Sequence, residues 1–152
     1  MDSLLKDAVI QKLSILKDSI IHETVDPGYW QLSIERDGYV VEIRQKGEDG
    51  FCEVWFANTY QGEDLIRLKG FFRDPSFMLE VRKLLTSPKI SWFPNVTDNE
   101  LAGYFVIRRC FIRSGDLDIA ELDEAIRSVV NYGTLAMYFT QVRIKKSGTT
   151  EH

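Results

Sequence analysis

Three strand patterns follow one another in residues 29–60, and two short turn sequences join them. In the first pattern Trp30, Leu32 and Ile34 alternate with polar residues, which is the period of a half-buried strand. The Asp-Gly pair at positions 37–38 supplies the positive φ angles of a tight hairpin turn. The segment therefore predicts an antiparallel meander that forms the spine of a sheet.

The last strand of this meander, residues 51–60, is apolar on both sides. Cys52, Val54 and Phe56 lie on one side of it, and Phe51 and Trp55 lie on the other. A strand that is half exposed usually has one polar side. This pattern therefore predicts either a central strand or a strand whose outer face meets a partner protein.

Further elements are expected on both sides of the meander. Apolar residues at helical spacing predict helices over residues 3–22 and 75–86 and a long last helix that begins near 118. Alternation predicts short strands over 65–69 and 90–93, the second closed by Pro94, and a long strand over 103–113. Residues 95–100 are expected to form a polar loop.

This order of elements predicts the fold class. It is an α+β fold, with N-terminal, middle and C-terminal helices packed on one face of a mainly antiparallel sheet. A single domain is expected over residues 1–146, followed by a flexible tail at 147–152. The chain has 152 residues, of which 44% are hydrophobic, and this is enough to bury a core without disulfide bonds.

Charge and cysteine content indicate the class of partner and the cellular compartment. The formal net charge of −4 argues against a nucleic-acid or anionic-membrane partner. No apolar run approaches the ~20 residues of a membrane-spanning helix, and no signal sequence is recognisable. Cys52 and Cys110 lie inside strand patterns, so a bond between them is conceivable, but buried free thiols are expected. Together these features predict a cytoplasmic protein.

Candidate catalytic and metal-binding residues are few. The histidines are His22, expected at the end of the first helix, and His152 at the end of the chain, and neither has a nucleophile placed by spacing. A group of acids before and within the last helix could hold a hard cation: Asp116, Asp118, Glu121, Asp123 and Glu124. Acids at a helix start also stabilise that helix, and this interpretation is preferred. The sequence therefore predicts no enzyme, no metal and no cofactor.

Arg108 and Arg109 are adjacent in the long strand and so point to opposite faces of the sheet. They cannot both serve one basic surface, and one of them must lie close to the helix-covered side. This geometry also disfavours nucleic-acid binding.

Aromatic residues give the strongest functional signal. They make up 12% of the chain, more than one side of a small sheet can bury. Exposed aromatic side chains commonly anchor protein interfaces. The candidate partner-binding residues are Trp55, Phe51, Phe71, Phe72, Trp92 and Phe93.

The order of elements resembles the fold shared by class I type III secretion chaperones and the YbjN-like proteins. The resemblance covers residues 3–142 and depends on the Asp-Gly hairpin, the strand at 103–113 and the Asp-Leu-Asp sequence at 116–118. It implies dimeric chaperones that hold extended partner segments, or regulatory proteins without enzymatic activity. It carries over no individual binding residue.

The sequence thus predicts a non-enzymatic module that binds another protein, as a chaperone, adaptor or assembly factor. Binding would use an apolar sheet face or an edge strand, and a homodimer is one expected assembly. The alternative is a small-ligand pocket between sheet and helices, with weak or metal-dependent catalysis as a variant. That alternative requires convergent polar groups such as Tyr104, Tyr132 or Arg109.

Overall fold

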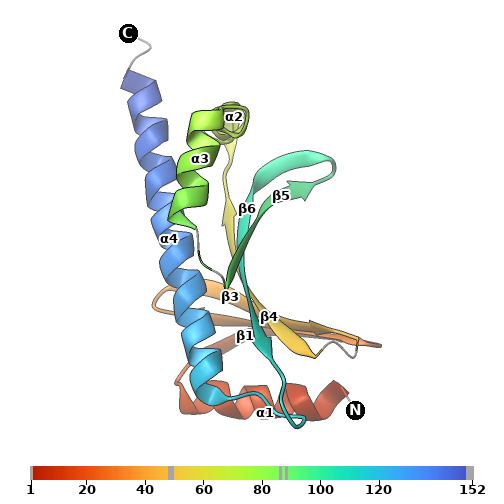
Figure 1. The fold of residues 1–152 in the computed structure, drawn as a ribbon. Coiled ribbons are helices and arrows are strands. Elements are labelled where there is room, and N and C mark those ends of the chain that lie inside the picture. The colour runs from red at the N-terminus through yellow and green to blue at the C-terminus, as the bar shows by residue number, and fades with distance from the viewer. Residues whose placement is uncertain (1, 48–49, 86, 88, 150–152) are drawn as a thin grey trace. The chain divides into compact units, whose positions relative to one another are not determined.

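The structure is a computed structural model that describes residues 2–47, 50–85, 87 and 89–149. Its elements in chain order (Figure 1) are α1 Asp2–Ile15, β1 Ser19–Asp26, β2 Tyr29–Arg36, β3 Tyr39–Lys46, β4 Phe51–Thr59, α2 Gly62–Phe72, α3 Pro75–Leu84, β5 Ile90–Thr97, β6 Glu100–Phe111 and α4 Ile119–Thr149. The strands form one six-stranded sheet in the order β1-β2-β3-β4-β6-β5. The predicted α+β class with a mainly antiparallel sheet is confirmed.

The chain divides into two compact units. The first comprises Met1–Phe56 and Ile107–Val130, and the second comprises Ala57–Val106 and Asn131–His152. Strands β4 and β6 and helix α4 therefore each contribute to both units. The units are described separately below.

In the first unit the meander is confirmed, and β1 adds a strand before it. Strands β1, β2 and β3 pair antiparallel, and β3 pairs with β4 in the same way. Asp37 and Gly38 both have positive φ, as the predicted hairpin turn requires. The core of this unit lies between one sheet face and two helices, α1 and the start of α4. Its fully buried members include Val9, Leu13, Trp30, Leu32, Ile34, Val41, Ile43, Cys52, Val54, Leu122 and Ile126.

The first helix is shorter than predicted. It ends at Ile15, and the expected helical residues 19–22 form the start of β1. Lys17 has a φ of 63°, which breaks the helix although the residue is not glycine. The carboxylate of Asp18 then binds Arg36 of β2 at 2.6–2.7 Å. This tertiary contact and the pairing of β1 with β2 override the apolar stripe that continues into Ile20.

The second unit contains α2, which was wrongly predicted as a strand over residues 65–69. Ile66 and Leu68 are two residues apart, as in a strand, but Leu65, Leu68 and Phe72 have helical spacing. Leu68 is buried in the core of the unit, whereas Ile66 is 68% exposed. A short apolar run satisfies both periods, so the sequence pattern alone did not decide between them.

Two other elements of the second unit, α3 and β5, are explained by the chemistry of their capping residues and prolines. Helix α3 begins as predicted, with Pro75 at its first position and the Asp74 carboxylate accepting a hydrogen bond from the Ser76 amide. Strand β5 continues through Pro94 to Thr97, so the predicted loop at 95–100 is wrong. Proline is tolerated there because β5 is an edge strand. Asp98 and Asn99, both with positive φ, make a tight turn into β6.

Helix α4 begins where the acids predicted it and extends to Thr149. Residues 150–152, the remainder of the segment expected to be a tail, lie outside the described residues, as does the candidate His152. Among the described residues, no helix is both long enough and apolar enough to cross a lipid bilayer.

Candidate functional site

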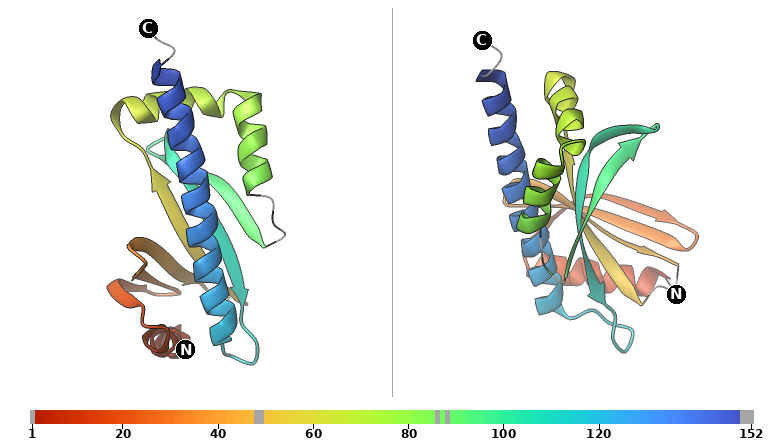
Figure 2. Two further views of the ribbon diagram at one scale, coloured as in Figure 1. Left: turned by 90° about the vertical axis from the view of Figure 1, so that its left-hand side faces the viewer. Right: turned by 45° about the horizontal axis from the view of Figure 1, so that its top comes forward.

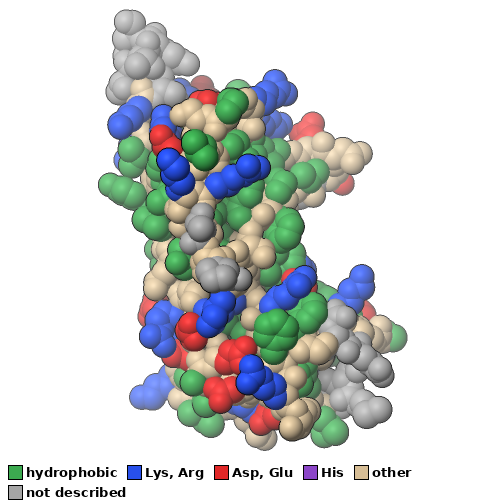
Figure 3. Space-filling model, viewed as in Figure 1, with side chains coloured by type: hydrophobic (Ala, Val, Ile, Leu, Met, Phe, Trp, Pro, Cys, Tyr) green, Lys and Arg blue, Asp and Glu red, His purple; other side chains and the backbone are tan. Residues whose placement is uncertain are grey.

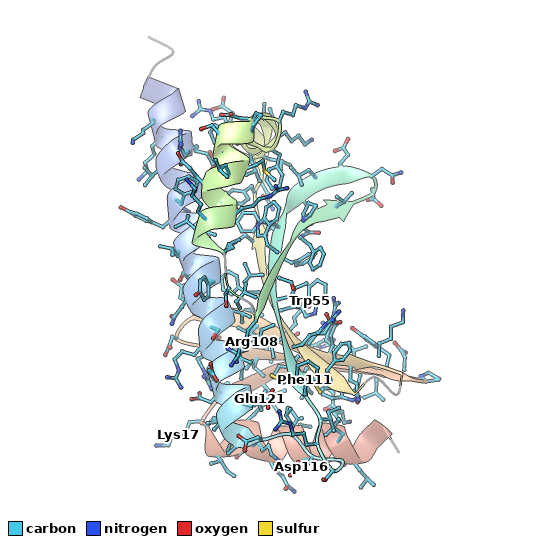
Figure 4. The ribbon with its side chains drawn as sticks, viewed as in Figure 1. Lys17, Trp55, Arg108, Phe111, Asp116 and Glu121 are labelled. Carbon is cyan, nitrogen blue, oxygen red and sulfur yellow. The ribbon has the colours of Figure 1, made fainter. Side chains whose placement is uncertain are left out.

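Strand alternation in the first unit separates two sheet faces. Cys52, Val54 and Phe56 of β4 point into the helix-covered core, so Phe51 and Trp55 point to the opposite face. Figure 4 shows Arg108 directed toward α4 and Trp55 on the far side of the strands. Strand β4 carries apolar residues on both of its sides because it lies between β3 and β6 in the sheet.

Arginine and aromatic side chains stack on this second face. The guanidinium carbon of Arg44 lies 3.3 Å from the centre of the Trp55 ring, and that of Arg109 lies 4.5 Å from the centre of the Phe51 ring. Phe51 meets Phe111 edge to face, with ring centres 6.4 Å apart. Three strands, β3, β4 and β6, thus supply side chains to the same sheet face. We name these five residues (Arg44, Phe51, Trp55, Arg109 and Phe111) the Arg–aromatic face.

Carboxylates are interleaved with the Arg–aromatic face. In the ladder between β3 and β4, Glu42 lies opposite Trp55 and Arg44 lies opposite Glu53. Positive and negative side chains therefore alternate around the rings. Figure 3 shows both charge types intermixed with hydrophobic side chains over the lower part of the view. Such a surface offers apolar contact area together with directional charge, and it has no strong net sign.

The prediction that Arg108 and Arg109 serve different faces is confirmed. Arg108 is 5% exposed and donates hydrogen bonds to Glu124 and Ser128 of α4 at 3.2 and 2.8 Å. Arg109 is exposed on the other face, over Phe51. Only one of the two arginines is therefore available to a binding partner.

The six predicted partner-binding residues are divided between the two units. Phe51 and Trp55 belong to the Arg–aromatic face of the first unit. Phe72 and Trp92 stack in the second unit at 5.5 Å, and Phe71 stacks on the buried Phe77 at 5.1 Å. Phe71, Phe72 and Trp92 contribute to the packing of the second unit through these rings, and all five residues, Phe51 and Trp55 included, are half-buried. Phe93, in edge strand β5, is 51% exposed.

Three members of the Arg–aromatic face, Arg44, Arg109 and Phe111, were not predicted as partner-binding residues. Phe111 is 54% exposed and occupies the end of β6. The alternation of β6 was visible in the sequence, but the position of Phe111 beside Phe51 depends on how β6 is aligned with β4. The backbone bond from Ile112 N to Gly50 O, at 2.9 Å, fixes that alignment. A sequence pattern alone does not provide it.

The structure gives little support to the small-ligand alternative, which required convergent polar groups such as Tyr104. Tyr104 is 2% exposed and its hydroxyl lies 3.4 Å from that of Tyr60 in the second unit. Burial raises the pKa values of both tyrosines, so both hydroxyls stay protonated at neutral pH. A shallow pocket of about 450 Å³ exists in this unit, and none of these tyrosines lines it. Its lining residues are Arg82, Leu85, Ser87, Ile90 and Trp92.

Asp118, one member of the acidic group, caps the start of α4, as the preferred interpretation of these acids predicted, whereas Asp116, Asp123 and Glu124 pair with basic side chains. Asp118 accepts a hydrogen bond from the Glu121 amide at 3.0 Å, which is N-terminal capping. Asp116 pairs with Lys12, and Asp123 pairs with Arg36. Within the described part of the chain, no three His, Cys, Asp or Glu side chains are placed to share a metal ion. His22 lies on β1 rather than at a helix end, near the Thr24 hydroxyl.

Cys52 and Cys110 are buried free thiols in the first unit. Burial raises the pKa of each to about 12. The unfolded thiol ionises near its ordinary value, so these groups support stability fully below about pH 8.5. That contribution to stability is lost as the pH rises toward 12, because the thiols of the unfolded state ionise at a lower pH than those of the folded state.

We expect both thiols to react with Ellman's reagent at pH 8 about a hundredfold more slowly in the native protein than in urea. The reason is that reaction requires opening of the first unit. The measurement is the release of the coloured thiolate over time. Native rates equal to the rates in urea would show that these cysteines are accessible.

The chain was compared with known proteins. No protein-family model matches it, and no curated protein matches its sequence significantly. Two solved structures are similar over most of its length. An uncharacterised protein from Methanothermobacter thermautotrophicus has a TM-score of 0.74 at 18% identity, covering 91% of this chain and 98% of that chain.

The second similar structure is that of YbjN from E. coli, which its description presents as a candidate transcription regulator. It has a TM-score of 0.60 at 13% identity and covers 90% of this chain and 91% of that chain. Such low identities establish the fold and nothing finer. The chain has the YbjN-like fold that its order of elements predicted.

Proposed function

We propose that this protein is a non-enzymatic module that binds another protein through the Arg–aromatic face. The observation that carries the proposal is the stacking of Arg44 on Trp55 and of Arg109 on Phe51, on the sheet face opposite the buried core of the first unit. Arginine and aromatic residues are the types most enriched at the energetic centres of protein interfaces. Stacking also holds each guanidinium in place before a partner arrives, which lowers the entropy lost on binding.

The alternating charges of the face support a protein partner rather than a nucleic acid. Glu42 and Glu53 lie among the arginines, and carboxylates would repel a phosphate backbone. A protein surface can place opposite charges against both signs. The free buried thiols fit a reducing compartment, so the proposed site of action is the cytoplasm. YbjN, which has the same fold, is described as a candidate transcription regulator. A regulator can act by binding another protein, so this description is compatible with the proposal.

The test is capture of partners by tagged protein carrying Phe111→Glu, with Tyr138→Glu as the control. Phe111 is 54% exposed on the Arg–aromatic face, and Tyr138 is 68% exposed on α4 in the second unit. Loss of a central aromatic contact costs about 2 kcal/mol or more, so we expect affinity to fall about thirtyfold in the first variant only.

Partners would be quantified by mass spectrometry, and thermal melting would confirm that both variants fold. A set of proteins retained by wild type and Tyr138→Glu but lost by Phe111→Glu is the expected result. Equal capture by all three proteins would contradict the proposal.

A further inference from the structure

The two free thiols of the first unit lie on neighbouring strands. Cys52 is on β4 and Cys110 is on β6, and both are fully buried on the core side of the sheet. Figure 2 shows the two strands (yellow and teal) side by side, as their order in the sheet requires. Whether the thiols meet therefore depends on how β4 is aligned with β6.

The alignment of these strands places the cysteines opposite each other. The backbone bond from Ile112 N to Gly50 O, at 2.9 Å, makes these two residues a hydrogen-bonded pair of the ladder. The next pair along the ladder has its two rings in edge-to-face contact, and the pair after that is Cys52 with Cys110. The two kinds of pair alternate in an antiparallel ladder, so the cysteines again form a hydrogen-bonded pair.

The separation of such a pair suits a disulfide bond. The Cα atoms of a hydrogen-bonded antiparallel pair lie ~5.5 Å apart, and disulfides join Cα atoms that are ~4.4–6.8 Å apart. Both side chains point into the core, whereas their neighbours Phe51 and Phe111 lie on the Arg–aromatic face. Besides burial and the charge of Glu121, the nearness of Cys52 raises the pKa of Cys110, which agrees with close approach of the two thiols.

We propose that Cys52 and Cys110 form a reversible disulfide that links β4 to β6 when a low-molecular-weight disulfide oxidises the pair. The dithiol is the resting form in a reducing compartment, where protein disulfides are mostly transient. Both thiols are buried, so oxidation requires opening of the first unit, and closing of the unit then brings the two sulfurs together. The inference goes beyond the proposed function and does not depend on the Arg–aromatic face.

The reaction is thiol–disulfide exchange in two steps. The thiolate of one cysteine attacks the small disulfide, which forms a mixed disulfide and releases one small thiolate. The thiolate of the other cysteine then attacks the cysteine sulfur of the mixed disulfide, which forms the bond between Cys52 and Cys110 and releases the second small thiolate. The two cysteines thus give up two electrons and two protons, and two small thiols carry them away.

The experiment is incubation of the purified native protein with mixtures of reduced and oxidised glutathione, followed by acid quenching, alkylation and peptide mass spectrometry. The matched control exchanges two core positions of β4, Cys52→Val with Val54→Cys, since both positions are fully buried and the composition stays the same. A cysteine at position 54 is diagonal to Cys110, and diagonal neighbours lie ~7–8 Å apart, beyond the reach of most disulfides. We expect this variant to form about tenfold less intramolecular disulfide than wild type at the same glutathione ratio.

The bond is expected to stabilise the fold once it has formed. A link between segments far apart in the chain restricts the unfolded state. We therefore expect the melting temperature of the oxidised protein to exceed that of the dithiol by about 5 °C or more. Dithiothreitol should remove the gain, and Cys110→Ser should show no gain after the same treatment.

Three results would overturn the proposal. One is a wild-type protein that keeps both thiols free, or carries only mixed disulfides with glutathione, at every ratio. Another is an exchanged variant that forms the bond as readily as wild type, which would show that the strand alignment does not direct the pairing. The third is an oxidised protein that melts below the dithiol, since a bond between aligned strands leaves the sheet intact. All three are measured without a partner, so they leave the proposed function untouched.

Discussion

Replacement of Arg36 by methionine is expected to lower the free energy of unfolding by about 3–5 kcal/mol. The Arg36 guanidinium binds both oxygens of Asp18 at 2.6–2.7 Å and the carboxylate of Asp123 at 2.6 Å. The Asp18 side chain is 3% exposed. Methionine would fill the space but leave a buried carboxylate without its cation, which is the costly way to break a buried ion pair. Urea unfolding gives the value.

The matched control is Arg127→Met, because Arg127 pairs with the same Asp123 but has a side chain that is 62% exposed. An exposed pair contributes about 0–1 kcal/mol. Partial burial works to raise the pKa of Asp123, but hydrogen bonds from Arg36 and Arg127 outweigh it, and the pKa is lowered. The resulting stability is present above the unfolded pKa and is lost as the pH falls. Equal unfolding free energies for both variants would refute this account of Arg36.

The second large effect is expected for Gly103→Ala, which should destabilise the second unit by about 3 kcal/mol or more. A Cβ at position 103 would lie 1.7 Å from the carbonyl oxygen of Asn58 and 2.7 Å from its carbonyl carbon. These are backbone atoms of β4, so the two strands must separate. Asn58 is held from the other side, since its amide donates to Gly133 O at 3.2 Å.

Gly70→Ala provides the control for Gly103→Ala. Gly70 lies within α2, and a Cβ there would meet nothing within 4 Å. Alanine favours a helix over glycine by about 0.5–1 kcal/mol, so this variant should gain stability. Thermal melting of both variants gives the sign directly. A Gly103→Ala protein as stable as wild type would show that β4 and β6 are not held so closely.

The elements that were predicted correctly are those that local chemistry specifies. The Asp37-Gly38 turn, the Asp74-Pro75 helix start and the Asp118 cap each satisfy backbone groups within a few residues. The wrong predictions arose where a distant contact decided the outcome. The first helix stops where Asp18 meets Arg36, eighteen positions away, and an ambiguous apolar run became α2.

The candidate site could be predicted only in part for the same reason. Phe51 and Trp55 were identified because β4 is apolar on both sides. Arg44, Arg109 and Phe111 join them through strand pairing, which the sequence does not encode within one segment. Phe71, Phe72 and Trp92 share the aromatic composition of a binding surface, but their rings stack within the second unit. Amino-acid composition alone does not distinguish rings on a binding surface from rings that pack within a unit.

Arginine footprinting tests the central claim most directly. Protein with and without its captured partner would be treated with phenylglyoxal, and the modification of each arginine would be measured by mass spectrometry. The account predicts that the partner protects Arg44 and Arg109, whereas the exposed Arg73 of the second unit stays reactive. Unchanged modification of Arg44 and Arg109 in a saturated complex would contradict binding through the Arg–aromatic face.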